Sequence, residues 1–282
     1  MSVTVFSGTP CLLGEGPMWH PDRAELFWFD ILGKRLYAKG ATGERHWQFA
    51  ENVSAAGRID RDSLLIASET GLYRFNLMSG ERSLVVALEA VNDLTRSNDG
   101  RADPWGGFWI GTMGKNAEPG AGAIYRFYQG EVRKLVPDVT ISNSICFAPD
   151  RSVAYYADTS IGKIMRQPLA ASDGWPKGDA KVYLDLGHSG SLGVDGSVVD
   201  REGCLWNAQW GAGRVARYAP DGQLLQTISV PTPQASCPAF GGDDLSTLYV
   251  TTAADGVKGD GAGLTYVVPI DVAGVADPTV QL

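Results

Sequence analysis

The chain has 282 residues, of which 20% are charged and 44% are hydrophobic, and its formal net charge at pH 7 is −8. This composition is that of a folded globular protein, and the negative charge argues against nucleic acid or an anionic membrane as the main partner. No segment approaches the roughly 20 consecutive apolar residues of a membrane span, and the N-terminus lacks the features of a signal peptide. The four cysteines are scattered without a CxxC pair, so we expect free thiols in a cytoplasmic protein. The default expectation for the oligomeric state is a monomer.

The predicted elements are short strands that recur along the chain in one pattern. An aspartate that closes a turn is followed at the fifth and sixth residues by two strand-forming side chains, and at the eighth by a small or polar residue. In chain order the six segments are RAELFWFD after Asp22, RDSLLIAS after Asp60, PWGGFWIG after Asp103, RSVAYYAD after Asp150, REGCLWNA after Asp200 and DLSTLYVT after Asp243. These anchor aspartates are 38, 43, 47, 50 and 43 residues apart, and a period of about 44 is the length of a four-stranded propeller blade.

The repeat therefore predicts an all-β protein, a six-bladed β-propeller formed by residues 1–282 as a single domain. The strand-like LTYVVPI (264–270) is expected to fill part of the last blade. The N-terminal SVTVF (2–6) is expected to return and complete that blade, which would close the ring and remove an edge strand. We expect the aromatic residues of the repeat to pack between blades. The alternative is a β-sandwich in which the spacing is a coincidence.

Polar residues precede four of the six anchors at matching positions. The residues seven before their anchors are Glu15, Arg96 and Asn143, and those five before are Asn98 and Asp195. Positions seven and five point to the same side of an extended strand, so these side chains are expected to surround the central channel at one height. The equivalent positions of blades two and six are uncharged, namely Val53, Ala55, Ser236 and Pro238. The polar set is therefore one-sided, as a site would be.

Two further features of this set stay open. Asp99 has the opposite parity to Asn98, which predicts a supporting role unless a bulge redirects its side chain. The segments around Glu15, Asn98 and Asp195 are each rich enough in glycine and acidic or amide residues to form a turn in isolation. Their shared phase in the repeat favours a common site over three unrelated turns.

The side-chain types of the set favour a hard metal ion. Glu15 and Asp195 with the carboxamides of Asn98 and Asn143 make an all-oxygen donor set of formal charge −2, which suits Ca²⁺ or Mg²⁺. Zn²⁺ more often takes histidine or cysteine. The histidines are dispersed: His20 lies in the turn WHPD, His46 in a predicted outer strand, and His188 in the loop LGHSGSLG, where it could line the channel mouth.

Such a cation could polarise a carbonyl group and stabilise the oxyanion formed when water attacks it, while a carboxylate takes the proton from that water. No GxSxG motif, which would expose a serine nucleophile between a strand and a helix, occurs in such a position. Direct attack by water is therefore favoured over an acyl-enzyme intermediate. The residues alone thus predict a propeller with a central-channel metal site and a carbonyl or phosphoryl substrate.

Four segments carry a resemblance to a known family. LGEGPMWHPD (13–22), RSNDGRADPWGGFWIGTM (96–113), ISNSICFAPD (141–150) and GSVVDREGCLW (196–206) resemble the regucalcin/gluconolactonase (senescence marker) family of sugar lactonases, in order and across essentially the whole chain. The resemblance implies one divalent cation held by Glu15, Asn143 and Asp195, with Ca²⁺ first and Zn²⁺ or Mg²⁺ as alternatives. It implies Asp195 also as general base, and Arg96, Asn98 and Asp99 as substrate-binding residues.

The activity that the resemblance implies is hydrolysis of an aldono- or aldarolactone to the free acid, with a small sugar lactone as partner and no nucleic acid or membrane. Glu118, in the loop GKNAEPGAG, could also reach the substrate. Three alternatives remain: a calcium-binding regulatory propeller with little catalysis, an interaction scaffold, and a calcium-propeller phosphotriesterase.

Overall fold

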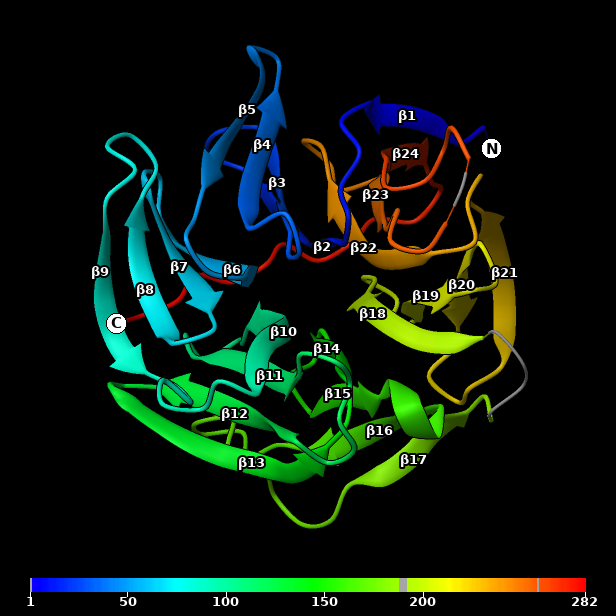
Figure 1. Cartoon of the computed structure of the whole chain (residues 1–282). Coiled ribbons are helices and arrows are strands. Elements are labelled where there is room, and N and C mark those ends of the chain that lie inside the picture. The colour runs from blue at the N-terminus through cyan, green and yellow to red at the C-terminus, as the bar shows by residue number, and fades with distance from the viewer. Residues whose placement is uncertain (1, 188–191, 258) are drawn as a thin grey trace.

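A computed structural model of the chain describes residues 2–187, 192–257 and 259–282, and His188 lies outside them. The described residues form 24 strands and one short 3-10 helix, and the strands make six four-stranded antiparallel sheets. Figure 1 shows the sheets arranged like blades around a common central axis. The prediction of an all-β, six-bladed propeller is thereby confirmed, and the β-sandwich is excluded.

The first three blades each follow the chain from the channel outward. Blade 1 contains β2 (Gly14–His20), β3 (Glu25–Asp30), β4 (Arg35–Gly40) and β5 (Gly43–Gln48). Blade 2 contains β6 (Val53–Asp60), β7 (Ser63–Ser68), β8 (Gly71–Asn76) and β9 (Arg82–Ala87). Blade 3 contains β10 (Thr95–Ala102), β11 (Phe108–Gly114), β12 (Gly122–Tyr128) and β13 (Glu131–Val139).

The last three blades continue the same order, and the N-terminal strand joins the sixth. Blade 4 contains β14 (Ser142–Phe147), β15 (Val153–Asp158), the 3-10 helix η1 (Thr159–Ile161), β16 (Lys163–Pro168) and β17 (Lys181–Asp185). Blade 5 contains β18 (Gly193–Val199), β19 (Leu205–Trp210), β20 (Arg214–Tyr218) and β21 (Leu224–Ser229). Blade 6 contains β22 (Ala235–Gly241), β23 (Thr247–Thr252), β24 (Thr265–Pro269) and, outermost, β1 (Thr4–Ser7).

The residues that follow each anchor aspartate form the second strand of each blade and supply the core. Successive side chains on a strand point to opposite faces, so each second strand packs against both neighbouring blades. Phe27 contacts the core shared with blade 2, whereas Trp28 contacts the core shared with blade 6. Trp28, Trp109 and Trp206 are all fully buried in such layers. The expected packing of aromatic residues between blades is confirmed.

The innermost strands β2, β6, β10, β14, β18 and β22 line the channel and share one direction and one irregularity. Each begins at the same mouth of the channel, here called the strand-start mouth, and ends at the other, the strand-end mouth. Each also carries a register shift that begins within the first three residues of the strand, such as the one between Ser97 and Gly100. A bulge of this kind interrupts side-chain alternation and can turn two successive residues toward the channel.

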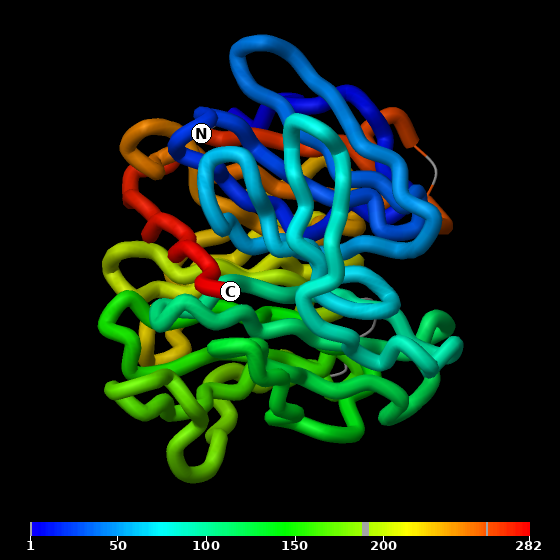
Figure 2. The backbone as a smooth tube through the Cα atoms, turned by 90° about the vertical axis from the view of Figure 1, so that its left-hand side faces the viewer, coloured from blue at the N-terminus to red at the C-terminus, as the bar shows by residue number. Residues whose placement is uncertain are grey.

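The C-terminal segment crosses the strand-end mouth after β24, and Figure 2 shows it running along one side of the molecule. Its backbone is held by several blades, because Gly274 N–H donates to Leu245 O, Val280 N–H to Arg58 O and Gln281 N–H to Gly106 O. The four cysteines are buried and unpaired, as expected. None of the described residues lies in a helix long and apolar enough to cross a membrane.

Candidate metal and substrate site

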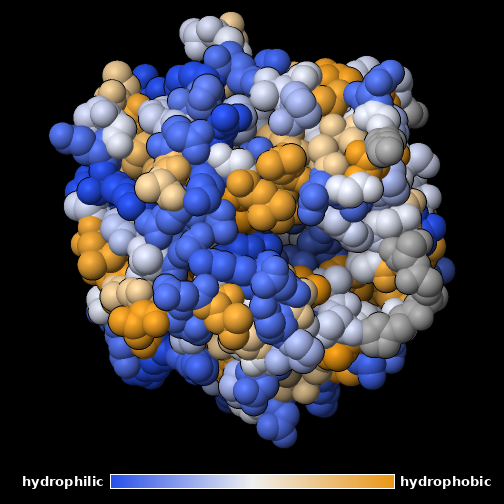
Figure 3. Space-filling view, viewed as in Figure 1, coloured by the Kyte–Doolittle hydropathy of each residue, from blue (hydrophilic) through white to orange (hydrophobic). Residues whose placement is uncertain are grey.

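The predicted site residues lie on inner strands of four different blades at the strand-start mouth. Glu15 lies on β2, Asn143 on β14 and Asp195 on β18, and each side chain is buried beside the register shift of its strand. The remaining three, Arg96, Asn98 and Asp99, lie together on β10 and are buried as well. Viewed from the direction of Figure 1, this face is hollowed near its centre, with hydrophilic residues in and beside the hollow and hydrophobic clusters on its rim (Figure 3).

The bulges explain how these side chains reach the channel. Gly16 follows Glu15 with φ of +53°, and a Cβ there would lie 2.3 Å from Ser54 O. Gly196 follows Asp195, and a Cβ there would lie 2.3 Å from Cys237 Sγ. Glycine is thus required for the inner strands to approach one another directly after two of the acidic residues. The segments that could have been isolated turns are bulged strands.

Two aspartates at the eighth position of the repeat fix the start of the strands that carry Glu15 and Asn143. Asp30 Oδ1 accepts the N–H of Leu13 at 3.0 Å, two residues before Glu15. Asp158 Oδ1 accepts the N–H of Ile141 at 3.1 Å, two residues before Asn143. The repeat did not predict that these two aspartates fix the inner strands. Its only sign of them was the small or polar residue that recurs at the eighth position.

A chain of hydrogen bonds orients the amides of the site. Arg96 Nη1 donates to Asn98 Oδ1 at 2.7 Å, and Asn98 Nδ2 donates to Asn143 Oδ1 at 3.2 Å. Asn143 Nδ2 in turn donates to Thr159 Oγ1 at 2.8 Å, which places the Asn143 oxygen away from η1. The carboxamide of Asn98 is occupied by Arg96, so Asn98 links the guanidinium to Asn143.

Asn98 and Asp99 both lie within the bulge of β10 between Ser97 and Gly100, so strict alternation does not apply there, yet the backbone contact of Asp99 agrees with the supporting role predicted for it. Asp99 Oδ2 accepts the N–H of Ile145 on the neighbouring blade at 2.6 Å. One oxygen of Asp99 therefore supports β14, while its charge acts on Glu15 and Asp195.

The electrostatics of the site show a surplus of buried negative charge. Burial, followed by the charge of Asp99, raises the pKa of Glu15 to about 8. Burial, followed by the charges of Glu15 and Asp99, raises the pKa of Asp195 well above its ordinary value. Burial lowers the pKa of Arg96 to about 10, although Glu15, Glu69 and Asp195 oppose this shift. Glu15 and Asp195 thus share the guanidinium of Arg96 in a setting of low dielectric constant, and the nearby charge of Asp99 adds to the negative surplus.

This donor set fits a divalent cation by its chemistry. Glu15, Asn143 and Asp195 offer oxygen atoms only, and a dication would compensate the buried charge that Arg96 alone does not. Among the described residues, no group of three histidine, cysteine, aspartate or glutamate side chains is arranged to hold a metal ion. The proposed set contains two such residues and an amide.

The other polar residues considered from the sequence lie elsewhere or serve local structure. Glu118 accepts hydrogen bonds from the Asn116 side chain at 2.9 Å and from the Asn116 backbone at 3.0 Å within its own loop. His20 is buried at the end of β2, where Nε2 lies 3.3 Å from Asp60 O. His46 lies on β5, the outer strand of blade 1, as predicted.

Known proteins are similar to this chain in sequence and in fold. Residues 13–254 match the family described as the SMP-30/gluconolactonase/LRE-like region. The chain belongs to this family. Over its whole length it is similar to the crystal structure of a calcium-binding protein, regucalcin, from Agrobacterium tumefaciens, with 41% identity, a TM-score of 0.97 and coverage of 100% of this chain and 98% of that one.

Two family members named for their reactions are similar across nearly the full chain. L-Arabinolactonase of Azospirillum brasilense is 36% identical, with 97% of this chain and 93% of that protein covered. 6-Deoxy-6-sulfogluconolactonase of Pseudomonas putida is 33% identical, with 95% of each covered. The resemblance described from the four sequence segments is thereby confirmed.

Proposed function

We propose that this protein is a hydrolase that opens a sugar-acid lactone, of the aldono- or aldarolactone type, to the free acid with the help of one divalent cation. The observation that carries the proposal is the buried group of Glu15, Asp195 and Asn143 at one mouth of the channel, with its unbalanced negative charge. The lactonase names of the relatives support the reaction class.

Glu15, Asn143 and Asp195 would hold the cation, with Ca²⁺ as the first candidate and Mg²⁺ or Zn²⁺ as alternatives. When bound, the cation supplies Lewis acidity toward the lactone carbonyl and lowers the pKa of the carboxyl groups around it. This assignment is supported by the burial of all three side chains and by the hydrogen bonds that fix the backbone before Glu15 and Asn143 and orient the Asn143 amide.

Asp195 is the proposed general base, in addition to its part in holding the cation. Its carboxylate accepts a proton from water as the water oxygen forms a bond to the lactone carbonyl carbon. The bond between that carbon and the ring oxygen then breaks, and the ring oxygen leaves as a hydroxyl group after taking up the proton that Asp195 accepted from the water. One lactone and one water thus give one hydroxy acid, and no oxidant or second substrate is needed.

Arg96, Asn98 and Asp99 are the proposed substrate-binding residues. The Nε of Arg96 is buried, and none of the described residues accepts a hydrogen bond from it. A sugar hydroxyl, or the carboxylate of a diacid lactone, would satisfy this donor. Asn98 holds the guanidinium in place through its Oδ1, and Asp99 offers the oxygen that Ile145 does not occupy.

A panel of sugar lactones assayed near neutral pH, with and without a chelator, tests the proposal, and spontaneous opening must be subtracted. We expect at least one aldono- or aldarolactone to open faster than background, with the rate lost on chelation and restored by Ca²⁺. Phosphotriesters in the same assay serve as competing substrates, and their preferential hydrolysis would contradict the proposal.

A second candidate is a calcium-binding regulatory protein with little catalysis, since the similar Agrobacterium protein is described as calcium-binding. It predicts cation binding by calorimetry in a protein that opens none of the lactones. A monomeric state and a cytoplasmic location stay predictions, which gel filtration and cell fractionation would check.

A further inference from the structure

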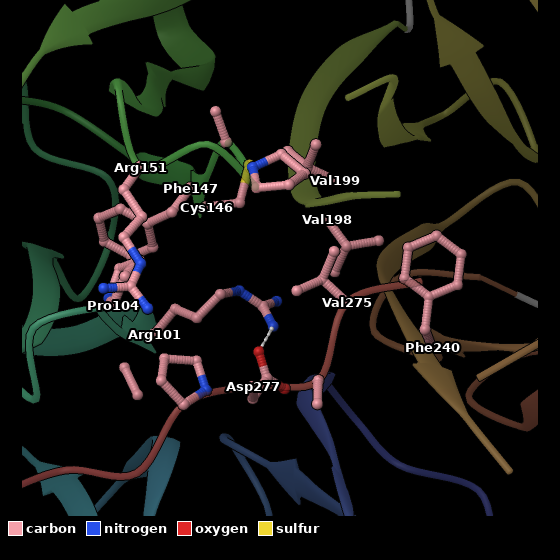
Figure 4. Close-up of a pocket in the computed structure, with 15 residues that line it drawn as sticks. Arg101, Pro104, Cys146, Phe147, Arg151, Val198, Val199, Phe240, Val275 and Asp277 are labelled. Carbon is pink, nitrogen blue, oxygen red and sulfur yellow. Dashed lines mark hydrogen bonds and ion pairs between the residues drawn. The ribbon is translucent and has the colours of Figure 1, made fainter. Parts of the chain in front are cut away.

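The opposite mouth of the channel contains a cavity of about 190 Å³. Its walls come from the ends of the inner strands and from the C-terminal segment, with apolar side chains such as Phe147, Val198 and Phe240 around it. Figure 4 shows Arg101 extending across the middle of this cavity to meet Asp277. Arg101 is on the same strand, β10, as the proposed substrate-binding residues.

Arg101 joins four parts of the fold through one guanidinium group. Its Nε donates to Ile145 O of blade 4 at 3.1 Å, and its Nη2 donates to Ser197 O of blade 5 at 3.4 Å. Its Nη1 pairs with Asp277 Oδ1 of the C-terminal segment at 2.9 Å. The side chain is only 11% exposed, so the charge of Asp277 is needed to offset the loss of hydration.

Both backbone polar groups of Ile145 form hydrogen bonds with side chains of blade 3. Asp99 accepts its N–H, and Arg101 donates to its carbonyl oxygen. The preceding Ser144 has a φ of +60°, a left-handed conformation that a serine adopts at some cost unless its surroundings enforce it. The Ser144 hydroxyl donates to the backbone oxygen of Asp195. The bulge of β14 is thus held between blades 3 and 5.

We propose that Arg101, fixed by Asp277, is a positioning residue that holds the bulge of β14 and thereby places Asn143 and Asp195 for cation binding. Asn143 lies two residues before Ile145, and Asp195 contacts Ser144 directly, so a shift of this bulge moves both. The C-terminal segment then serves the site at the other mouth by holding the Arg101 guanidinium. The effect on cation binding rests on the proposed function. The two hydrogen bonds that Asp99 and Arg101 form with the backbone of Ile145, here called the Ile145 clamp, do not.

Hydrogen exchange in the absence of added cation tests the clamp by itself. In Arg101→Lys the charge remains, but a single ammonium group cannot keep the three directions of the guanidinium fork. In Asp277→Asn the guanidinium loses its paired charge. We expect the Ile145 amide to exchange at least tenfold faster in both variants, with the amides of β6 unchanged. Arg151→Gln removes a second guanidinium from the same cavity and is the matched control.

Cation affinity measured by calorimetry, together with thermal melting, then tests the effect on the site. We expect Asp277→Asn to weaken binding of Ca²⁺ by roughly three- to tenfold and Arg151→Gln to leave it within twofold of the unmodified protein. The proposal is overturned if the variants lower only the melting temperature, if Ile145 exchange stays unchanged, or if Arg151→Gln has the same effects. An unmodified protein that binds no cation would refute the proposed function, while the exchange result would still decide the clamp.

Discussion

The two mouths of the channel hold buried charges in opposite ways. At the strand-start mouth the buried carboxyl groups of Glu15 and Asp195 share the guanidinium of Arg96, and the negative charge of Asp99 raises the pKa of both carboxyl groups further. At the strand-end mouth the guanidinium of Arg101 pairs with Asp277 at 2.9 Å. A buried ion pair whose charges cancel can join the C-terminal segment to the blades. A buried group of side chains with a net charge is costly in free energy unless a ligand of opposite charge binds to it. The difference identifies the strand-start mouth as the better candidate for function.

The largest expected effect comes from removing one charge at each mouth. Asp195→Asn should lower kcat/KM for the best lactone by two to four orders of magnitude, because both the base and a cation ligand are lost. Asp277→Asn should cost far less, since it acts on the site only through Arg101. Steady-state kinetics with the two variants side by side measures the ratio. Equal losses would remove the functional distinction between the mouths.

A smaller effect is expected from Arg96→Lys, which keeps the charge at the strand-start mouth but not the planar fork. The hydrogen bond to Asn98 and the free Nε cannot both be reproduced by an ammonium group. We expect kcat/KM to fall about 10- to 100-fold, from the roughly 1.5–3 kcal/mol typical of hydrogen bonds to charged groups. Arg133→Lys is the matched control, because Arg133 pairs with Glu131 on the exposed outer strand β13. A fully active Arg96→Lys would argue against substrate contact by the guanidinium.

The smallest expected effect is on stability as a function of pH, and it sharpens the charge comparison. Because Glu15 has its pKa raised to about 8 from 4.5, the folded chain without a cation binds more protons than the unfolded chain between these values. Its stability should therefore fall as pH rises through this window. Thermal melts with chelator should show the decline, and added Ca²⁺ should raise the melting temperature more at pH 8 than at pH 5. A cation effect independent of pH would contradict this account.

Much of the fold could be predicted from the sequence because its signal is local and repeated. Pairs such as Phe27 with Trp28 recur at a period of about 44 residues, and their alternation on a strand forces burial on both faces. The shared phase of Glu15 and Asn143 likewise predicted inner strands of different blades at the same mouth. Their roles as ligands stay predictions.

The finer geometry of the site could not be obtained in this way, because bulges have no reliable local pattern. Asn98 and Asp99 both lie within the bulge of β10, so strict alternation along the strand does not fix where their side chains point. The register shift depends on how neighbouring strands meet, as the close approach of Gly196 to Cys237 illustrates.

The sequence by itself determined the number of blades and the buried second strand of each blade, because these follow from the periodicity of the side chains. Only the tertiary structure decided how the charges are paired. Arg101 and Asp277 lie 176 residues apart, and nothing near either of them in the chain indicates the other. Such a pair forms because closure of the ring brings the C-terminal segment across the channel, where a buried guanidinium requires an opposite charge.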